Sequence, residues 1–240
     1  MFAEMAVDGV RRRSRVVFLL DVDNTLIDND RGRELLATAT EGLLGHALSK
    51  EYWSLYEEVR TALGYVDSLE TLERFQGRHG DPTSGRLARA ILDFDYTDIR
   101  YPETLDVLAA LRRVGTPVVL SDGDPVFQAL KIARAGVADA VDDNVLVFAH
   151  KEEHLEDVAL LFPADHYIVV DDKAAILARI KLHWDRRVST VHVLQGKYAD
   201  DEFEGPRPDA VIGRIGELER LVGTADALRV FLEGASIRRA

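Results

Sequence analysis

Residues 18–26 read FLLDVDNTL, an apolar run that ends in two carboxylates separated by one residue. The run at 16–20 is typical of a short buried strand. Because alternate side chains of a strand share one side, Asp21 and Asp23 leave the strand end in the same direction. Like charges at this spacing repel unless a cation lies between them. A divalent metal ion that prefers oxygen ligands would bind both carboxylates and offset their repulsion. We therefore expect a metal site here; a solvated turn is the alternative, since Asp and Asn are common turn residues.

After residue 100, short apolar segments alternate with helical patterns along the rest of the chain. The expected strands lie at 117–120, 145–148, 167–170 and 188–194, with a last short strand at 209–212. The expected helices lie at 103–114, 124–135, 152–161, 174–184, 214–222 and 224–235. This alternation indicates parallel β-α-β units whose sheet is covered by helices on both faces. We predict an α/β fold with a Rossmann-like parallel sheet, in which ligands bind outside the carboxyl ends of the strands.

Residues 31–96 interrupt this pattern directly after the first strand. Apolar residues there recur at three- and four-residue steps, as on one face of a helix, and no alternating strand pattern appears. A break at residues 77–82, GRHGDP, separates the later helices. An all-helical insertion at this point sits above the carboxyl ends of the strands, where a lid belongs. We predict two domains, an α/β core at 1–30 and 97–240 and a helical cap at 31–96.

Composition and charge limit the classes of partner. The chain has 240 residues, 47% of them hydrophobic, which is enough for one sizeable core with a smaller attached unit. Its formal net charge of −12 repels phosphate backbones, so we expect no nucleic-acid partner. A small phosphorylated molecule stays compatible, because a bound metal ion reverses the local field. The sequence has no Cys, which excludes disulfides and thiolate metal sites.

The sequence gives no membrane or targeting signal. No apolar stretch approaches the roughly 18 residues that span a bilayer, so we expect no membrane association. Residues 1–9 are mixed and acidic, unlike a signal peptide, and the predicted location is cytoplasmic. A basic run at 11–15, RRRSR, favours a solvated N-terminal arm over an anion-binding surface in a chain this acidic. A homodimer is left open.

Two polar residues follow the second and third expected strands. Ser121 follows the strand at 117–120, and its hydroxyl can bind a phosphoryl oxygen or cap the next turn. Asp124 already suits the capping position, which leaves Ser121 for the first role. Lys151 follows the strand at 145–148 and opens a helix, where a cation opposes the helix dipole. Lys151 is therefore locally misplaced, which argues for a functional role.

The strand at 167–170 ends in the paired acids Asp171 and Asp172. The carboxyl ends of parallel strands meet at one edge of a sheet. We therefore expect these acids, together with the hydroxyl and the ammonium that follow the neighbouring strands, to converge on Asp21 around one cation.

With these residues in place, DVDNTL at 21–26 resembles the first motif, D-x-D-x-T-L/V, of the haloacid dehalogenase (HAD) superfamily. The strand before Ser121 is similar to the second motif, Lys151 to the third-motif lysine, and the Asp-Asp pair to one form of the fourth. The likeness covers about residues 16–30 and 100–195, and the insertion resembles the smaller C1 type of HAD cap. Asp122 and Lys173 depart from the pattern. We expect Asp122 to point away from phosphate or bind a water, and Lys173 to weaken metal binding.

The resemblance implies a Mg²⁺-dependent phosphatase that acts on a small phosphorylated metabolite. Asp21 is then the nucleophile that forms an aspartyl-phosphate, and Asp23 is the general acid and base. Ser121 and Lys151 bind the substrate phosphate and stabilise its transferring oxygens. The residues implied in holding Mg²⁺ are Asp21, Asp23 through its backbone carbonyl, Asp171 and Asp172.

Three other functions stay open. A phosphomutase keeps Asp23 and shares every motif. A haloacid dehalogenase needs no metal and resembles D-x-Y-G-T at the first motif, where Asp23 and Asn24 stand instead. A catalytically inactive fold that binds a phosphorylated ligand or a protein partner is supported by Lys173 and Asp122 and opposed by the intact pair of acids.

Overall fold

The computed structural model describes residues 13–237 of the chain. The expectation of no signal peptide at 1–9 falls outside this range, as does the start of the basic run at 11–15. The first strand begins at Ser14, so the end of that run belongs to the sheet and not to an arm. Over residues 13–237, no helix combines the length and the apolar character that crossing a membrane requires.

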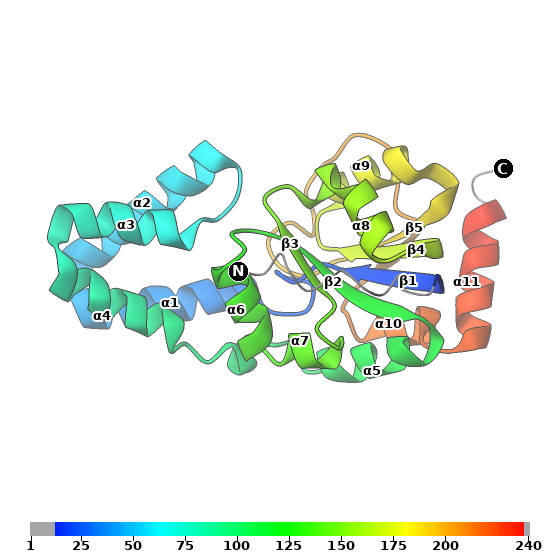
Figure 1. Ribbon diagram of the computed structural model, residues 1–240, viewed down its shortest axis with the longest axis horizontal. Helices are drawn as coiled ribbons and strands as arrows, with labels where there is room; N and C mark the ends of the chain where they lie inside the picture. The colour runs from blue at the N-terminus through cyan, green and yellow to red at the C-terminus, as the bar shows by residue number, and fades with distance from the viewer. Residues whose placement is uncertain (1–12, 238–240) are drawn as a thin grey trace.

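In the described part of the chain, parallel strands form one sheet in the order β3-β2-β1-β4-β5-β6 (Figure 1). The strands are β1 (Ser14–Leu20), β2 (Thr116–Asp122), β3 (Val145–Phe148), β4 (Ala164–Asp171), β5 (Val188–Val193) and β6 (Ala210–Ile212). β1 is central and pairs with β2 on one side and β4 on the other. The strand order changes direction at β1, and ligands of such sheets bind outside the strand ends at this switch point. The predicted α/β fold with a Rossmann-like parallel sheet is confirmed.

Helices cover both faces of the sheet, and β1 supplies side chains to both layers. Phe18 and Leu20 pack into one core cluster, whereas Val17 and Leu19 pack into the other. This two-sided burial explains why the strand is apolar throughout and does not alternate. The first layer holds α5 (Thr104–Val114), α6 (Phe127–Arg134), α7 (Val137–Ala140), α10 (Glu217–Val222) and α11 (Ala225–Ile237). The second holds α8 (Leu155–Leu161) and α9 (Ala174–Trp184).

Four helices between β1 and α5 form a lobe that projects beyond one end of the sheet (Figure 1). They are α1 (Asn29–Leu44), α2 (His46–Leu63), α3 (Ser68–His79) and α4 (Asp81–Leu92). Their buried apolar side chains make a separate cluster of Tyr52, Leu55, Leu72, Phe75, Leu87 and Ile91. Single glycines with positive φ, Gly45 and Gly80, join α1 to α2 and α3 to α4, so the expected break at 77–82 is shorter than the sequence indicated. The predicted domain boundaries at 31 and 96 stay a prediction.

Two helices of the core begin later than the sequence pattern indicated. The helix expected from residue 124 begins at Phe127, because the Asp124 carboxylate accepts the N–H groups of Val126 and Phe127 and so caps a turn before the helix. The helix expected from residue 152 is divided into the 3-10 helix η2 (Lys151–Glu153) and α8. Helix α7 and the short 3-10 helices η1 (Tyr96–Ile99) and η3 (Asp185–Arg187) were not expected, since three or four residues carry no detectable period.

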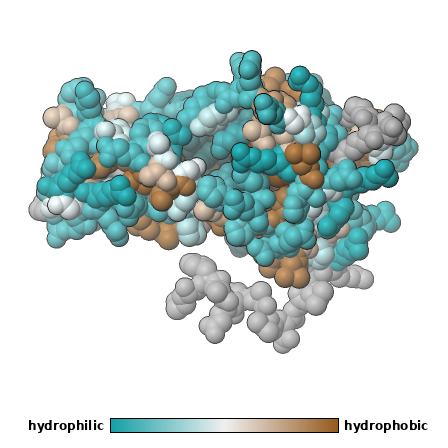
Figure 2. Space-filling model, turned by 90° about the horizontal axis from the view of Figure 1, so that it is seen from above, coloured by the Kyte–Doolittle hydropathy of each residue, from teal (hydrophilic) through white to brown (hydrophobic). Residues whose placement is uncertain are grey.

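The face of the molecule seen in Figure 2 is predominantly hydrophilic, in keeping with the acidic composition. Hydrophobic residues appear on it as separate small areas. The homodimer that the sequence left open stays a prediction, as does the cytoplasmic location.

Candidate active site

Asp21 is the first residue after β1, and its carboxylate is held from two sides. The residue is only 5% exposed. Thr25 Oγ1 donates a hydrogen bond to Asp21 Oδ2 at 3.1 Å, and Lys151 Nζ lies 2.5 Å from Oδ1. Thr25 reaches back to Asp21 because the chain turns sharply at Asn24, whose φ is 61°. The carboxylate therefore has a fixed position and orientation at the end of the central strand.

Lys151 lies at the centre of the acidic cluster and is 1% exposed. Its Nζ is 2.5 Å from Asp21 Oδ1 and 2.7 Å from Asp171 Oδ2. Burial opposes the charge, but Asp171, Asp21 and Asp122 together raise the pKa of Lys151 well above its usual range. The lysine is therefore charged at neutral pH, and the acids around it explain why a cation stands at the start of η2.

Three buried carboxylates meet at this point, from Asp21, Asp171 and Asp172. Each offers an oxygen within 4.8 Å of the other two. Neither oxygen of Asp172 has a hydrogen-bond partner among residues 13–237. Burial, with the charges of Asp21 and Asp171, raises the pKa of Asp172 to about 9, and burial raises that of Asp171 to about 6 despite Lys151. Buried oxygens without partners are costly, and a hard divalent cation is the ligand that satisfies them, so the cluster fits a metal site.

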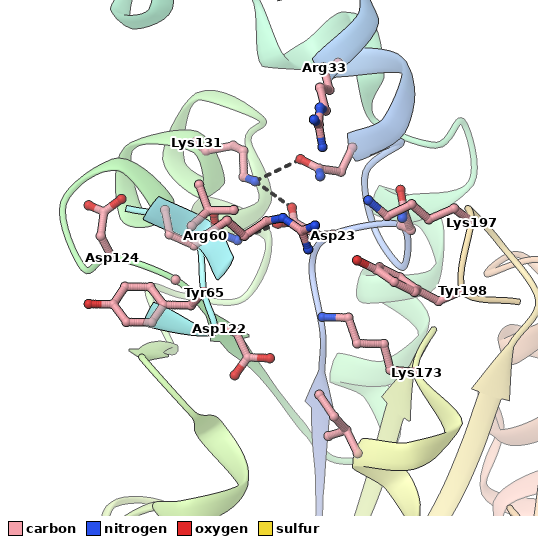
Figure 3. Close-up of a pocket in the computed structure, with 18 of the residues that line it drawn as sticks. Asp23, Arg33, Arg60, Tyr65, Asp122, Asp124, Lys131, Lys173, Lys197 and Tyr198 are labelled. Carbon is pink, nitrogen blue, oxygen red and sulfur yellow. Dashed lines mark hydrogen bonds and ion pairs between the residues drawn. The ribbon is translucent and has the colours of Figure 1, made fainter. Parts of the chain in front are cut away.

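Asp23 faces the same space from the opposite side of the turn. Its Oδ1 lies 2.6 Å from Lys131 Nζ (Figure 3). Its Oδ2 accepts a hydrogen bond from Gln128 Nε2 at 3.3 Å. Gln128 Nε2 also donates to Ser121 Oγ at 2.8 Å. Helix α6 thus links the hydroxyl at the end of β2 to the second acid of the first motif.

A cavity of about 550 Å³ opens above Asp23, between the strand ends and the helices α1 and α2. Its lining combines aromatic side chains with charged ones of both signs. The acidic residues are Asp23, Asp122, Asp124, Glu152, Asp201 and Glu202. The cationic residues are Arg33, Arg60, Lys131, Lys173, Arg179 and Lys197. Figure 3 shows Arg33 and Lys197 arriving from different elements around Asp23. The space is larger than a phosphate group requires, so it has room for the rest of a small-molecule substrate.

Comparison with known proteins places the chain in a family. No family model and no curated protein matches it. A solved haloacid dehalogenase-like hydrolase from Burkholderia xenovorans LB400 is 40% identical, with a TM-score of 0.81; the match covers 89% of this chain and 98% of that one. The chain belongs to the HAD superfamily. The sequence-based assignment to HAD hydrolases is confirmed.

More distant HAD structures share the fold. A HAD hydrolase of Bacillus subtilis bound to magnesium is 14% identical, with a TM-score of 0.61, and the match covers 89% of this chain and all of that one, 100%. An L-2-haloacid dehalogenase from Xanthobacter autotrophicus is 22% identical, with a TM-score of 0.56, over 86% of this chain and 97% of that one. HAD proteins with different chemistry therefore share this architecture, and the reaction has to be argued from the site.

Within this HAD site, the two residues that depart from the motifs have defined contacts. Asp122 turns towards Lys151: its Oδ1 accepts the backbone N–H of Lys151 at 2.9 Å and so fixes the start of η2. Lys173 donates its own backbone N–H to Asp171 Oδ1 at 2.8 Å. Its ammonium lies 5.3 Å from the centre of the Tyr198 ring. Burial opposes its charge, but Asp21 and Asp171 raise the pKa of Lys173 to about 12, so it adds a cation at the mouth of the HAD site.

The structure places the six predicted site residues at the carboxyl ends of the strands. They are Asp21, Asp23, Ser121, Lys151, Asp171 and Asp172. Sequence reasoning missed two further residues, Gln128 and Lys131, which reach Asp23 from more than a hundred positions away. They are three residues apart on α6, so they share one helix face. Their place on the helix that follows the second-motif strand is the signal that could have indicated them.

Proposed function

We propose that this HAD hydrolase is a Mg²⁺-dependent phosphomonoesterase that acts through an aspartyl-phosphate on Asp21. The observation that carries the proposal is the position of the Asp21 carboxylate. Thr25 and Lys151 hold it beside two further buried acids, and Asp23 stands at the edge of the substrate-sized cavity. A small phosphorylated metabolite is the substrate class that this arrangement serves.

The side chains of the chain divide the work of the two steps. A carboxylate oxygen of Asp21 attacks phosphorus while the bond from phosphorus to the alcohol oxygen breaks, and Asp23 gives that oxygen its proton. Asp23 then takes a proton from the water that hydrolyses the aspartyl-phosphate. The Lys151 ammonium and the Ser121 hydroxyl stabilise the negative charge on the transferring oxygens. Gln128 donates hydrogen bonds to both Ser121 and Asp23 and so fixes the position of each relative to the other.

The metal requirement rests on the buried acids. Asp21, Asp171 and Asp172, with the backbone carbonyl of Asp23, would hold Mg²⁺, and the unpartnered oxygens of Asp172 support this set. When bound, Mg²⁺ neutralises charge on the phosphoryl oxygens and orients them. Hydrolysis of a haloacid needs no metal ion, so the cluster of buried acids and the presence of Asp23 lead us to favour a phosphomonoester over a haloacid as the substrate.

The proposal is tested by phosphate release from p-nitrophenyl phosphate with millimolar Mg²⁺ or EDTA. We expect Mg²⁺-dependent turnover, a loss of about 10⁴-fold or more in Asp21→Asn, and little change in Asp165→Asn, an exposed acid at the far end of β4. Chloride release from 2-chloropropionate without metal would indicate a dehalogenase. Binding of p-nitrophenyl phosphate with no turnover would indicate an inactive fold, and an aspartyl-phosphate that outlasts exchange of substrate would indicate a mutase.

A further inference from the structure

The cap side of the cavity carries two arginines that share one carboxylate. Arg33, on α1, and Arg60, on α2, both contact Glu57, with Arg60 Nε 2.8 Å from Glu57 Oε2. The side chains of Arg33, Arg60 and Glu57 are 33%, 39% and 37% exposed, so all three are partly open to solvent. Arg33 and Arg60 both line the cavity, and in Figure 3 Arg33 enters it from the cap.

Aromatic rings fix the position of Arg33 before any ligand arrives. Its guanidinium carbon lies 5.0 Å from the centre of the Tyr56 ring and 5.5 Å from that of Trp53. Trp53 is itself held, because its Nε1 donates a hydrogen bond to Thr40 Oγ1 at 3.0 Å. A guanidinium placed in this way loses little conformational entropy when it binds a ligand.

The charges of this cluster do not cancel. Burial opposes ionisation of Glu57, but hydrogen bonds from Arg60 and Arg33 lower its pKa, so the carboxylate is charged. Two guanidinium groups and one carboxylate give this cluster a net charge of plus one. The residues of α1 and α2 that line the cavity include both arginines and no acid. Each guanidinium has five N–H donors in a planar fork, and Glu57 occupies few of them. The donors that remain suit a second planar monoanion.

We propose that Arg33 and Arg60 bind a carboxylate on the leaving group, so that the substrate is a phosphorylated carboxylic acid. Its phosphate lies against Asp21 and its carboxylate against the cap. The single excess positive charge matches a carboxylate monoanion better than a second phosphate dianion. This inference rests on the proposed phosphatase activity and adds the substrate class to it.

The test uses a homologous series of ω-phosphooxy carboxylic acids with two to six carbons, each paired with its primary amide. The amide keeps the size and the phosphate but removes the second charge. For at least one chain length, we expect kcat/KM to be about ten- to a hundredfold higher for the acid than for the amide. In Arg33→Gln and in Arg60→Gln this ratio falls towards one, and in Arg60→Lys it falls less, because charge without the planar fork is retained.

The matched control is Arg78→Gln, on the outer side of the cap, where Arg78 pairs with Glu51 at 3.1 Å. This variant keeps the wild-type ratio. A ratio near one at every chain length, or a preference for the acid that survives both glutamine substitutions, would overturn the inference while leaving the phosphatase intact. Absence of Asp21-dependent phosphate release from acids and amides alike would instead remove the proposed function.

Discussion

The strand ends of the core and the helices of the cap both carry charged groups, but the two sets differ in how far they are buried. At the strand ends the charged groups are buried and fixed: Asp21, Lys151 and Asp171 form contacts of 2.5 and 2.7 Å and are at most 5% exposed. In the cap, Arg33 and Arg60 are about one-third exposed and rest on a small separate core. Under the proposed function, the reaction therefore depends on buried, closely paired groups at the strand ends, whereas substrate recognition depends on partly exposed groups of a lobe with its own apolar cluster.

Lys151→Met has the largest expected effect, and it tests the buried charged groups at the strand ends. It leaves three buried acids without their cation, and removing one partner of a buried ion pair costs about 3–5 kcal/mol. We expect a loss of this size in the free energy of unfolding, measured by urea denaturation in EDTA at pH 8. Activity falls as well. Lys50→Met, at an exposed position of α2, is the control; equal stability of the two variants would mean that the acid cluster does not depend on Lys151.

Phe75→Ala tests whether the apolar cluster of the cap unfolds independently of the clusters that cover the sheet. Phe75 is fully buried between the cap helices, and truncation of a buried phenylalanine costs about 3 kcal/mol or more. We expect faster hydrogen exchange confined to residues 29–92 and a higher KM, with Mg²⁺ binding retained. Phe18→Ala, in β1, serves as the comparison and destabilises the whole sheet. Loss of exchange protection in β1 and β4 of Phe75→Ala would show that cap and core unfold as one unit.

Asp172→Asn tests what it costs to bury three acids together without a metal ion, and its expected effect depends on pH. A carboxyl whose folded pKa is raised, here to about 9, stabilises the fold fully below its unfolded value of about 4 and loses that contribution as the pH rises through 9. The contribution of Asp172 to the stability of the metal-free wild type therefore falls from pH 4 to pH 9. We expect Asp172→Asn to be about 1–3 kcal/mol more stable in EDTA at pH 8, equal near pH 4, and weaker in Mg²⁺ binding. Parallel stability curves of the two proteins against pH would contradict this.

Gln128→Ala gives the smallest expected effect. It removes the side chain that connects Ser121 to Asp23. Without Gln128, Ser121 and Asp23 lose their common hydrogen-bond partner. We expect kcat to fall about tenfold, with a smaller change in KM and a melting temperature near the wild-type value. Gln76→Ala, an exposed position on α3, is the control. A change in KM alone would assign Gln128 to substrate binding.

Sequence reasoning reached the fold and the strand-end residues because these follow from local pattern. An apolar run followed by an acid fixes both a buried strand and the place of its functional group, as at Asp21 and Asp171. The contacts of Gln128, Lys131 and Arg33 do not follow from such a pattern, since each depends on two distant segments meeting in space. Asp122 shows the same limit, because its partner, the N–H of Lys151, lies 29 residues away.

The buried ammonium of Lys151 has a consequence for how the protein is made. Because the chain brings its own counterion to Asp21 and Asp171, a newly synthesised molecule can close its sheet around these acids without a cation from solution. Under the proposed function, folding would then not depend on the supply of Mg²⁺, and a cell short of magnesium would accumulate folded protein that waits for its ion.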